Sequence, residues 1–299
     1  MNDAYTKQVR LLLSVLPEVA KEDCFALHGG TAINLFVRDM PRLSVDIDLT
    51  YIDIAQRGET LVGINAALGR IKDRIDGLRP SIRVQHRHNV CKLQVDEHGV
   101  IIKVEVNRVG RGLLGESNTL PLCEVAQEQF DAFCAMPLVP MGQLYGGKMC
   151  AALDRQHPRD LFDVKLLLDN EGFTDEIKSG FVFALASSNR PTYELLNPRL
   201  LDQSTAFRNQ FDGMSAIEFT YGDYETTRFE LIETVKSRLT ENDKTFLLSL
   251  NRLASDWSIY DYQRFPSVSW KLLNLEKFKK EDPERYQKQL VELESVLAH

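Results

Sequence analysis

Residues 44–51, SVDIDLTY, constrain the fold more than any other segment of the chain. Polar and apolar side chains alternate through it with the two-residue period of a strand, in which successive side chains point to opposite faces. The apolar members can pack on a core, while Ser44, Asp46 and Asp48 share the opposite face. We therefore expect a strand that is buried on one face and carries two adjacent carboxylates on the other.

Two carboxylates side by side repel each other unless a cation lies between them. Mg²⁺ is the natural candidate, because it prefers hard oxygen ligands and binds nucleotide phosphates as well. Asp46 and Asp48 are therefore candidate metal ligands. The alternative is an exposed strand face with two unrelated aspartates, which a lone Asp-x-Asp pattern would favour.

A strand, a tight turn and a helix precede this segment. Residues 25–28 are a short apolar strand, Gly29-Gly30-Thr31 closes it, and a helical pattern resumes at residues 32–37. Glycines let a backbone approach a phosphate, and the start of a helix offers free N–H groups and a positive dipole end. Glycine is common in any tight turn, so the signal gains weight only from the two aspartates that follow.

A third carboxylate lies on a later strand, residues 100–106. Its pattern puts Lys103 and Glu105 on one face and the apolar residues on the other. If this strand pairs beside residues 44–51, Glu105 joins Asp46 and Asp48. The alternative is a Lys–Glu pair on the surface.

A fourth group of charges lies between Lys148 and Asp163. Lys148 and Arg155 are seven residues apart on an expected helix, residues 141–155, and Asp160 and Asp163 are three apart on the next, so each pair shares a face. The cations could hold a triphosphate. The alternative is an Arg155–Asp160 salt bridge that ties the two helices together. Gly146-Gly147, just before Lys148, permits close approach of another chain or a ligand.

The chain changes character along its length. The first 110 residues alternate between helical and strand patterns, and the pattern after Pro140 is helical. We expect an α/β domain at 1–135 and a mostly helical domain at 136–299. The expected elements are helices at 4–16, 59–77 and 283–297 and strands at 44–51, 82–84, 90–95 and 100–106, the last two joined by a turn at 96–99.

Charge is unevenly distributed. The formal net charge is −7, yet residues 70–111 hold ten basic and five acidic residues. A folded surface could therefore show a basic face on an acidic body, although a solvated helix and hairpin would look the same in sequence. No apolar run is long enough to span a membrane, and the five scattered cysteines support neither a zinc site nor a disulfide framework. We expect a cytoplasmic protein.

Together these motifs resemble the AbiEii/AbiGii toxin family, which includes the MenT-type toxins. The resemblance is carried by GGTAINL (29–35), RLSVDIDL (42–49), IKVEV (102–106), Lys148 and LDRQHPRDLFDV (153–164), with a weaker match at SWKLLNL (269–275). It implies a nucleotidyltransferase core of the DNA polymerase β type, with a mixed sheet and a helical C-terminal domain. It also implies a toxin of a toxin–antitoxin or phage-defence system, paired with an AbiEi-type antitoxin.

The same resemblance implies Mg²⁺-dependent transfer of a nucleotide from an NTP to RNA, with the 3′ end of tRNA as acceptor. Gly30 and Thr31 would then hold phosphates, Asp46 and Asp48 the metal. Glu105 would be the third carboxylate, Lys148 would bind the triphosphate, and Asp160 or Asp163 would be the acid of the second domain. Gly29 and Arg155 would help to hold the pyrophosphate, and Ser44 would support the metal ligands.

Readings from other classes remain open. A small-molecule nucleotidyltransferase of the aminoglycoside type shares the Gly-Gly and Asp-x-Asp core and needs no basic RNA track. A kinase-like activity would use the same phosphate chemistry. A non-catalytic binding module would keep the fold, but it has no need of clustered carboxylates.

Overall fold

The computed structural model describes residues 3–298 and divides into two compact units. The first runs to Pro140 and regains residues 211–218, while the second holds residues 141–210 and those from Phe219 onward. The returning segment joins the first unit by backbone hydrogen bonds, Leu43 N–H to Met214 O and Ala216 N–H to Pro41 O, both 2.9 Å. Local sequence pattern does not reveal this return, because its partners lie far away in the chain.

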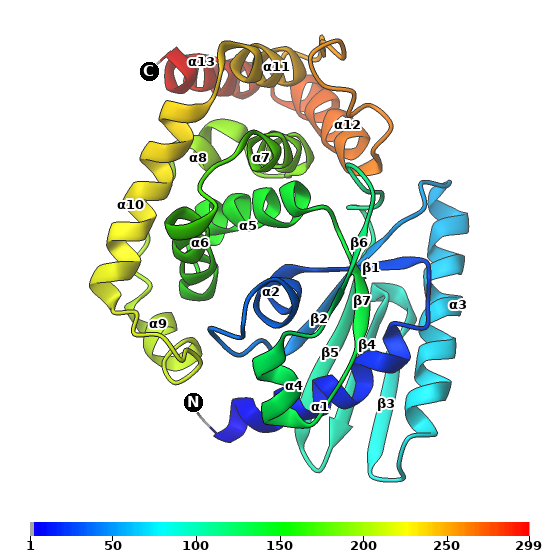
Figure 1. Ribbon diagram of the computed structural model, residues 1–299. Coiled ribbons are helices and arrows are strands. Elements are labelled where there is room, and N and C mark those ends of the chain that lie inside the picture. Colours follow the sequence, from blue (N-terminus) through cyan, green and yellow to red (C-terminus); the bar gives the residue numbers. More distant parts are fainter. Residues whose placement is uncertain (1–2, 299) are drawn as a thin grey trace. The chain divides into compact units, whose positions relative to one another are not determined.

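A seven-stranded mixed sheet forms the body of the first unit (Figure 1). The strand order is β3-β4-β5-β2-β1-β7-β6. Pairs β2–β5 and β1–β7 are parallel and the others antiparallel, so the expected α/β class with a mixed sheet is confirmed. The strands are β1 Phe25–His28, β2 Asp46–Tyr51, β3 Ile82–Arg87, β4 Lys92–Glu97, β5 Val100–Asn107, β6 Asn118–Pro121 and β7 Ala135–Leu138.

Helices α1 (Asp3–Val19) and α3 (Arg57–Asp76) pack against the sheet through apolar side chains. Ile47, Leu93 and Val104 are fully buried there, in keeping with the two-residue period of their strands. The alternate residues of β2 to β5 form the other face, which is mostly polar and half-buried or exposed, apart from the buried Thr50 and the apolar Ile101. One face of these strands therefore packs into the core. The other, called the open face below, leaves polar side chains available for a functional site.

The turn after β1 begins a short helix, α2 (Gly29–Ala32), which continues as a π-helix over Ile33–Val37. Asn34 is fully buried and donates to Gly30 O over 2.9 Å. The expected strand at 44–51 starts later than predicted, because regular pairing with β1 and β5 begins only near Asp46. Ser44 and Val45 belong to the preceding irregular segment. A short helix, α4 (Glu124–Phe130), connects β6 to β7.

The second unit is helical. The predicted helix over 141–155 is confirmed with the same bounds, and Pro158 opens the next helix in the first-turn position that proline favours. The helices are α5 Met141–Arg155, α6 Pro158–Asn170, α7 Asp175–Ser187, α8 Thr192–Leu196, α9 Ser204–Gln210, α10 Tyr221–Arg238, α11 Glu241–Asn251, α12 Pro266–Glu281 and α13 Pro283–Ala298.

Helices α5 and α7 cross at glycines. A Cβ added at Gly146 would overlap the backbone of Gly180, and one at Gly180 would overlap the backbone of Gly142. The close approach that Gly146 permits is therefore made by a helix of the same unit. Within residues 3–298, no helix is both long and apolar enough to span a membrane.

Candidate functional site

The register of the sheet places the predicted carboxylates next to one another. On the open face, Asp46 lies opposite Lys103 and Asp48 opposite Glu105, on the parallel strands β2 and β5. Neighbouring strands are about 4.8 Å apart, so these side chains are direct neighbours. Glu105 was expected to join the two aspartates if the two strands pair, and the two strands do pair.

The same row continues on both sides. Lys92 of β4 lies opposite Glu105, and Arg87 of β3 lies opposite Lys92. On the other side, His28 of β1 lies opposite Asp48. We refer to Arg87, Lys92, Glu105, Asp48 and His28 as the Asp48 row. Across the sheet it runs from two cations through two carboxylates to one imidazole.

Lys92 forms an ion pair with Glu105, whose side chain is 41% exposed. The sequence suggested Lys103 as the partner of Glu105, but the antiparallel register of β4 and β5 puts Lys92 directly across from it, and Lys103 lies beside Asp46. The sequence did contain this signal, since the tight turn predicted at 96–99 fixes which residues of the hairpin face each other.

The glycine turn touches the carboxylate of Asp48. Gly29 has a positive φ of +74°, and a Cβ at this position would lie 2.6 Å from Asp48 Oδ2. The backbone of the turn therefore approaches the carboxylate more closely than any side chain would allow. The first turn of α2 has no side-chain cap, as a site for an external anion requires.

Thr31 and Ser44 lie beneath the turn. Thr31 is fully buried; its Oγ1 lies 3.0 Å from Ser44 Oγ and donates to the carbonyl oxygen of Asp46 over 2.5 Å. Both hydroxyls therefore connect the turn to the start of β2. This arrangement supports the expected role of Ser44 behind the aspartates, while Thr31 can offer a phosphate only its backbone.

Sequence reasoning did not single out Arg42, which is 2% exposed. Its guanidinium donates to Leu43 O over 3.0 Å, and a Cβ on Gly30 would lie 2.8 Å from its Nη2. Arg42 is thus packed under the glycine turn. Its position depends on the distant segment 211–218, which pairs with residues 41–43, so no local pattern could have shown it.

The second unit holds the other predicted residues in one ion cluster. Lys148 Nζ lies 3.0 Å from Asp160 Oδ1 and 3.0 Å from Asp163 Oδ2, and all three side chains are buried. Arg155 adds a bond of 2.5 Å from Nε to Asp160 Oδ2 but is 63% exposed. Both aspartates face Lys148, and the Arg155–Asp160 salt bridge considered as an alternative is present.

This cluster sets the charge of Asp160. Burial alone raises the pKa of this carboxyl, but the charge of Lys148 and the hydrogen bond from Arg155 outweigh burial and hold the pKa well below its usual value. His157 begins the same helix: its Nδ1 accepts from the backbone N–H of Arg159 over 3.2 Å. Burial lowers the pKa of His157, which favours the neutral ring that this bond needs.

The first unit offers two neighbouring carboxylates as candidate metal ligands. Within residues 3–298, no three His, Cys, Asp or Glu side chains come together as a complete metal-binding group. Mg²⁺, however, is commonly bound by one or two carboxylates together with substrate phosphates and water. Asp46 and Asp48 fit that partial role, while Glu105 is engaged by Lys92.

Comparison with known proteins agrees with the motifs. The model of the family described as nucleotidyl transferase AbiEii toxin, type IV TA system, matches residues 10–295. The nucleotidyltransferase toxin MenT4 from Mycobacterium tuberculosis H37Rv has a similar structure, with a TM-score of 0.64 and 15% sequence identity over 91% of this chain and 93% of that chain. No curated protein sequence matches the chain. The resemblance drawn from the motifs and the nucleotidyltransferase fold with a helical C-terminal region are confirmed.

Proposed function

Because the chain belongs to the AbiEii family of nucleotidyl transferase toxins of type IV toxin–antitoxin systems, we propose that it transfers a nucleotide from an NTP to RNA, with the 3′ end of tRNA as acceptor. The observation that carries this proposal is the register of Asp46 and Asp48 with Lys103 and Glu105 on the open face of the sheet. A binding module would have no use for carboxylates in this arrangement.

Mg²⁺ is the proposed cofactor, with Asp46 and Asp48 as its protein ligands. When bound, it would neutralise charge on the NTP phosphates and on the leaving pyrophosphate. Glu105 is the third acidic group of the set, and Lys92 orients it through their ion pair. Ser44, hydrogen-bonded beneath the turn, keeps the start of β2 in place.

The glycine turn is proposed to hold phosphate oxygens. Gly29 and Gly30 present backbone without side chains, and the N–H groups of the first helical turn, including that of Thr31, would donate to those oxygens. The contact between Gly29 and Asp48 places this backbone beside the carboxylates. Phosphate binding and metal binding therefore belong to the same small region of the first unit.

Lys148 and Arg155 remain the proposed contacts of the triphosphate, with Asp160 and Asp163 holding Lys148 in one position. Arg155 is the more accessible of the two cations. Under this proposal, substitution of Arg155 raises the KM for NTP. Asp163→Asn affects the triphosphate contact indirectly, because Asp163 holds Lys148 in position.

The acceptor is proposed to be RNA because basic side chains share the open face with the carboxylates. Arg83, Arg87 and Lys103 are exposed and, by strand alternation and register, lie on the face of Asp46 and Asp48. Such side chains bind phosphate backbones. We further propose that transfer to tRNA blocks translation and growth in the cytoplasm, also during phage infection, and that an AbiEi-type antitoxin opposes it.

The test combines each α-labelled NTP, Mg²⁺ and one of three acceptors: total tRNA, an aminoglycoside or no acceptor. We expect label on tRNA with at least one NTP, and none with Asp46→Asn or Asp48→Asn although both remain folded. Label on the aminoglycoside alone would replace this proposal with the small-molecule reading. No label on any acceptor would favour a binding module.

A further inference from the structure

A second concave site lies wholly within the helical unit. A cavity of about 260 Å³ is bounded by α12, α13 and the residues that precede α8. Among residues 3–298, its lining contains three cations and four side-chain amides but no carboxylate: Asn189, Arg190, Pro191, Asn251, Lys271, Asn274, Leu275, Phe278, Arg285 and Gln289. Because Arg190 is ion-paired with Asp154 and Glu194, Lys271 and Arg285 supply the excess positive charge of the lining, which points to an anionic ligand.

Lys271 forms the floor of this cavity and is 4% exposed. Its ammonium donates to Leu185 O over 2.7 Å and to Thr192 Oγ1 over 3.0 Å, and both acceptors are uncharged. Within the described residues no carboxylate forms an ion pair with it and no third acceptor takes its remaining proton. Burial lowers the pKa of Lys271 to about 8, so at pH 7 the group still carries its charge in a dehydrated place.

A structural role explains part of this arrangement. Leu185 lies in the last turn of α7, so Lys271 satisfies one carbonyl at the C-terminal end of that helix. That role uses one of the three protons of the ammonium. It needs no more than a positive charge near the end of the helix. It does not account for the cavity above Lys271 or for the arginines at its rim.

Arg285 and Arg190 lie at that rim, and both are exposed. Arg190 is shared between Asp154 and Glu194, each at 3.2 Å. Within the described residues, by contrast, the guanidinium of Arg285 forms no ion pair. The cavity is thus lined both by a guanidinium that forms no ion pair within the described residues and by a buried ammonium, two groups that are suited to the oxygens of a phosphate.

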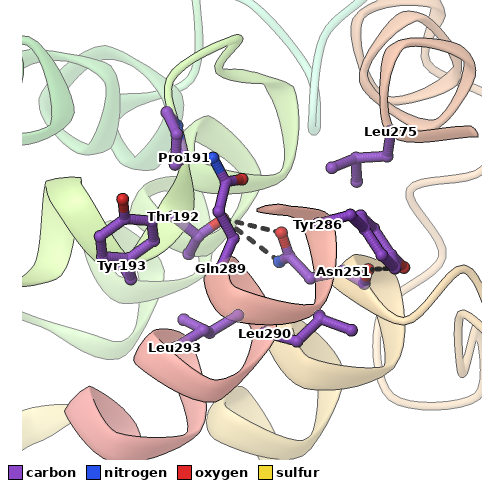
Figure 2. Close-up of a pocket in the computed structure, with 9 residues that line it drawn as sticks. All are labelled: Pro191, Thr192, Tyr193, Asn251, Leu275, Tyr286, Gln289, Leu290 and Leu293. Carbon is purple, nitrogen blue, oxygen red and sulfur yellow. Dashed lines mark hydrogen bonds between the residues drawn. The ribbon is translucent and has the colours of Figure 1, made fainter. Parts of the chain in front are cut away.

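The remaining walls are suited to an organic group. Leu275 and Phe278 supply apolar surface along α12, and Asn274 donates to Asn189 Oδ1 over 3.2 Å near the rim. Figure 2 shows the adjoining recess, which shares Pro191, Asn251, Leu275 and Gln289 with this cavity and in which Asn251 is hydrogen-bonded to Thr192. Lys271 is too deep for the backbone of a nucleic acid polymer, so the cavity favours a small molecule.

We propose that this cavity binds a small phosphate-bearing organic anion of mononucleotide size, with its phosphate on Lys271 and Arg285 and its planar or apolar part against Leu275 and Phe278. The site is separate from the proposed transfer reaction: none of its lining residues is among those proposed to bind the NTP, the metal or the RNA. The ligand would stabilise the helical unit by mass action, because only the folded cavity binds it.

The test is calorimetric titration of the full-length protein with 5′-AMP in EDTA, without Mg²⁺. We expect one saturable site per chain. Arg285→Gln should weaken binding about tenfold or more, since a charge-assisted contact is lost. Lys288→Gln, an exposed change on the same helix outside the cavity, should leave the affinity within about twofold.

Further arms separate this site from the others. Asp48→Asn should not change the affinity for 5′-AMP; loss in that variant with normal binding in Arg285→Gln would overturn the proposal. Lys271→Met should abolish binding, and if it fails to fold, Arg285→Gln carries the test alone. Inorganic phosphate that competes for the site with the same dependence on Arg285 supports it with a simpler ligand. No saturable binding of either compound, or an Arg285-dependent binding of an oligoribonucleotide only, would contradict it.

Discussion

At the scale of single residues, the backbone of Gly29 and the carboxylate of Asp48 lie so close that no side chain fits between them. The φ of Gly29 is +74°, and its Cβ would meet Asp48 Oδ2 at 2.6 Å. Gly99, in the hairpin between β4 and β5, has a similar φ of +83° but open space around it. The two glycines therefore share a backbone requirement, and only one of them has a packing requirement.

Gly29→Ala and Gly99→Ala test this difference. Both should lose roughly 1–2 kcal/mol of unfolding free energy in urea, because alanine disfavours positive φ. Only Gly29→Ala should also displace Asp48 and lower nucleotide transfer by about tenfold or more. Equal transfer rates in the two folded variants would show that the contact with Asp48 has no role in activity.

Pattern alone predicted Asp46 and Asp48 on one face, because strand alternation fixes the face of a side chain whatever surrounds it, and it predicted that Glu105 joins them if the two strands pair. Lys92 was missed although the hairpin register was implicit in the sequence. Arg42 could not be placed, because its burial depends on residues 211–218, which return from far along the chain. Residue-scale prediction therefore succeeds where local geometry decides and fails where a long-range contact does.

At the scale of helices and strands, the Lys148 cluster joins α5 to α6. Lys148 bridges Asp160 and Asp163, each at 3.0 Å. Removing the cation leaves two buried carboxylates with less compensation, so Lys148→Met should cost about 3–5 kcal/mol of unfolding free energy. Arg155→Gln should cost about 1 kcal/mol or less, because Arg155 is largely exposed. Urea unfolding of both variants checks this, and equal costs would contradict it.

The ionised carboxylate of Asp160 should make the unfolding free energy depend on pH in the acid range. Its pKa is lower in the folded chain than in the unfolded chain, so the unfolded state takes up more protons on acidification. The stability it contributes is therefore complete above a pH of about 4 and is lost as the pH falls below that value. In urea titrations between pH 6 and the acid limit, Asp160→Asn should flatten this slope, and an unchanged slope would argue against it.

Several elements followed from periodicity alone, such as α5 and the hairpin of β4 and β5. A helical segment was predicted at 32–37, but not its π-helical form over Ile33–Val37, and strands β6 and β7 were not predicted. The four residues of β1 are recognisable by their apolar run before a glycine turn, whereas β6 and β7 each contain a proline and carry too few alternations to be distinguished from loops. The late start of β2 has a similar cause, since apolar periodicity extends beyond the residues that actually pair.

At the scale of the whole molecule, ion pairs among the described residues of the first unit engage five of the ten basic side chains at 70–111, Lys72 and Lys92 among them. Arg70 and Arg74 bind Glu22, and Arg79 binds Glu97. Arg83, Arg87 and Lys103 remain exposed on the open face. The number of basic residues in this stretch is therefore larger than the number of cations available to bind an RNA. The register of the strands identifies the cations that remain on the open face.

Arg87→Gln should therefore weaken tRNA use and reduce the slope of log affinity against log salt by about 0.7–0.9. Arg79→Gln is the matched control, because the charge of Arg79 is already shared with Glu97. Binding titrations at several salt concentrations measure both slopes. Identical slopes for Arg87→Gln and the wild type would exclude this face as the path of the RNA.

The central claim is that the carboxylates in register on β2 and β5 perform nucleotide transfer. The most direct test is the rate at which label from an α-labelled NTP enters tRNA with Asp48→Asn and with Asp96→Asn, a carboxylate of the same face outside the Asp48 row. The account predicts loss of transfer in Asp48→Asn and a rate near that of the wild type in Asp96→Asn. Full activity in folded Asp48→Asn would contradict it.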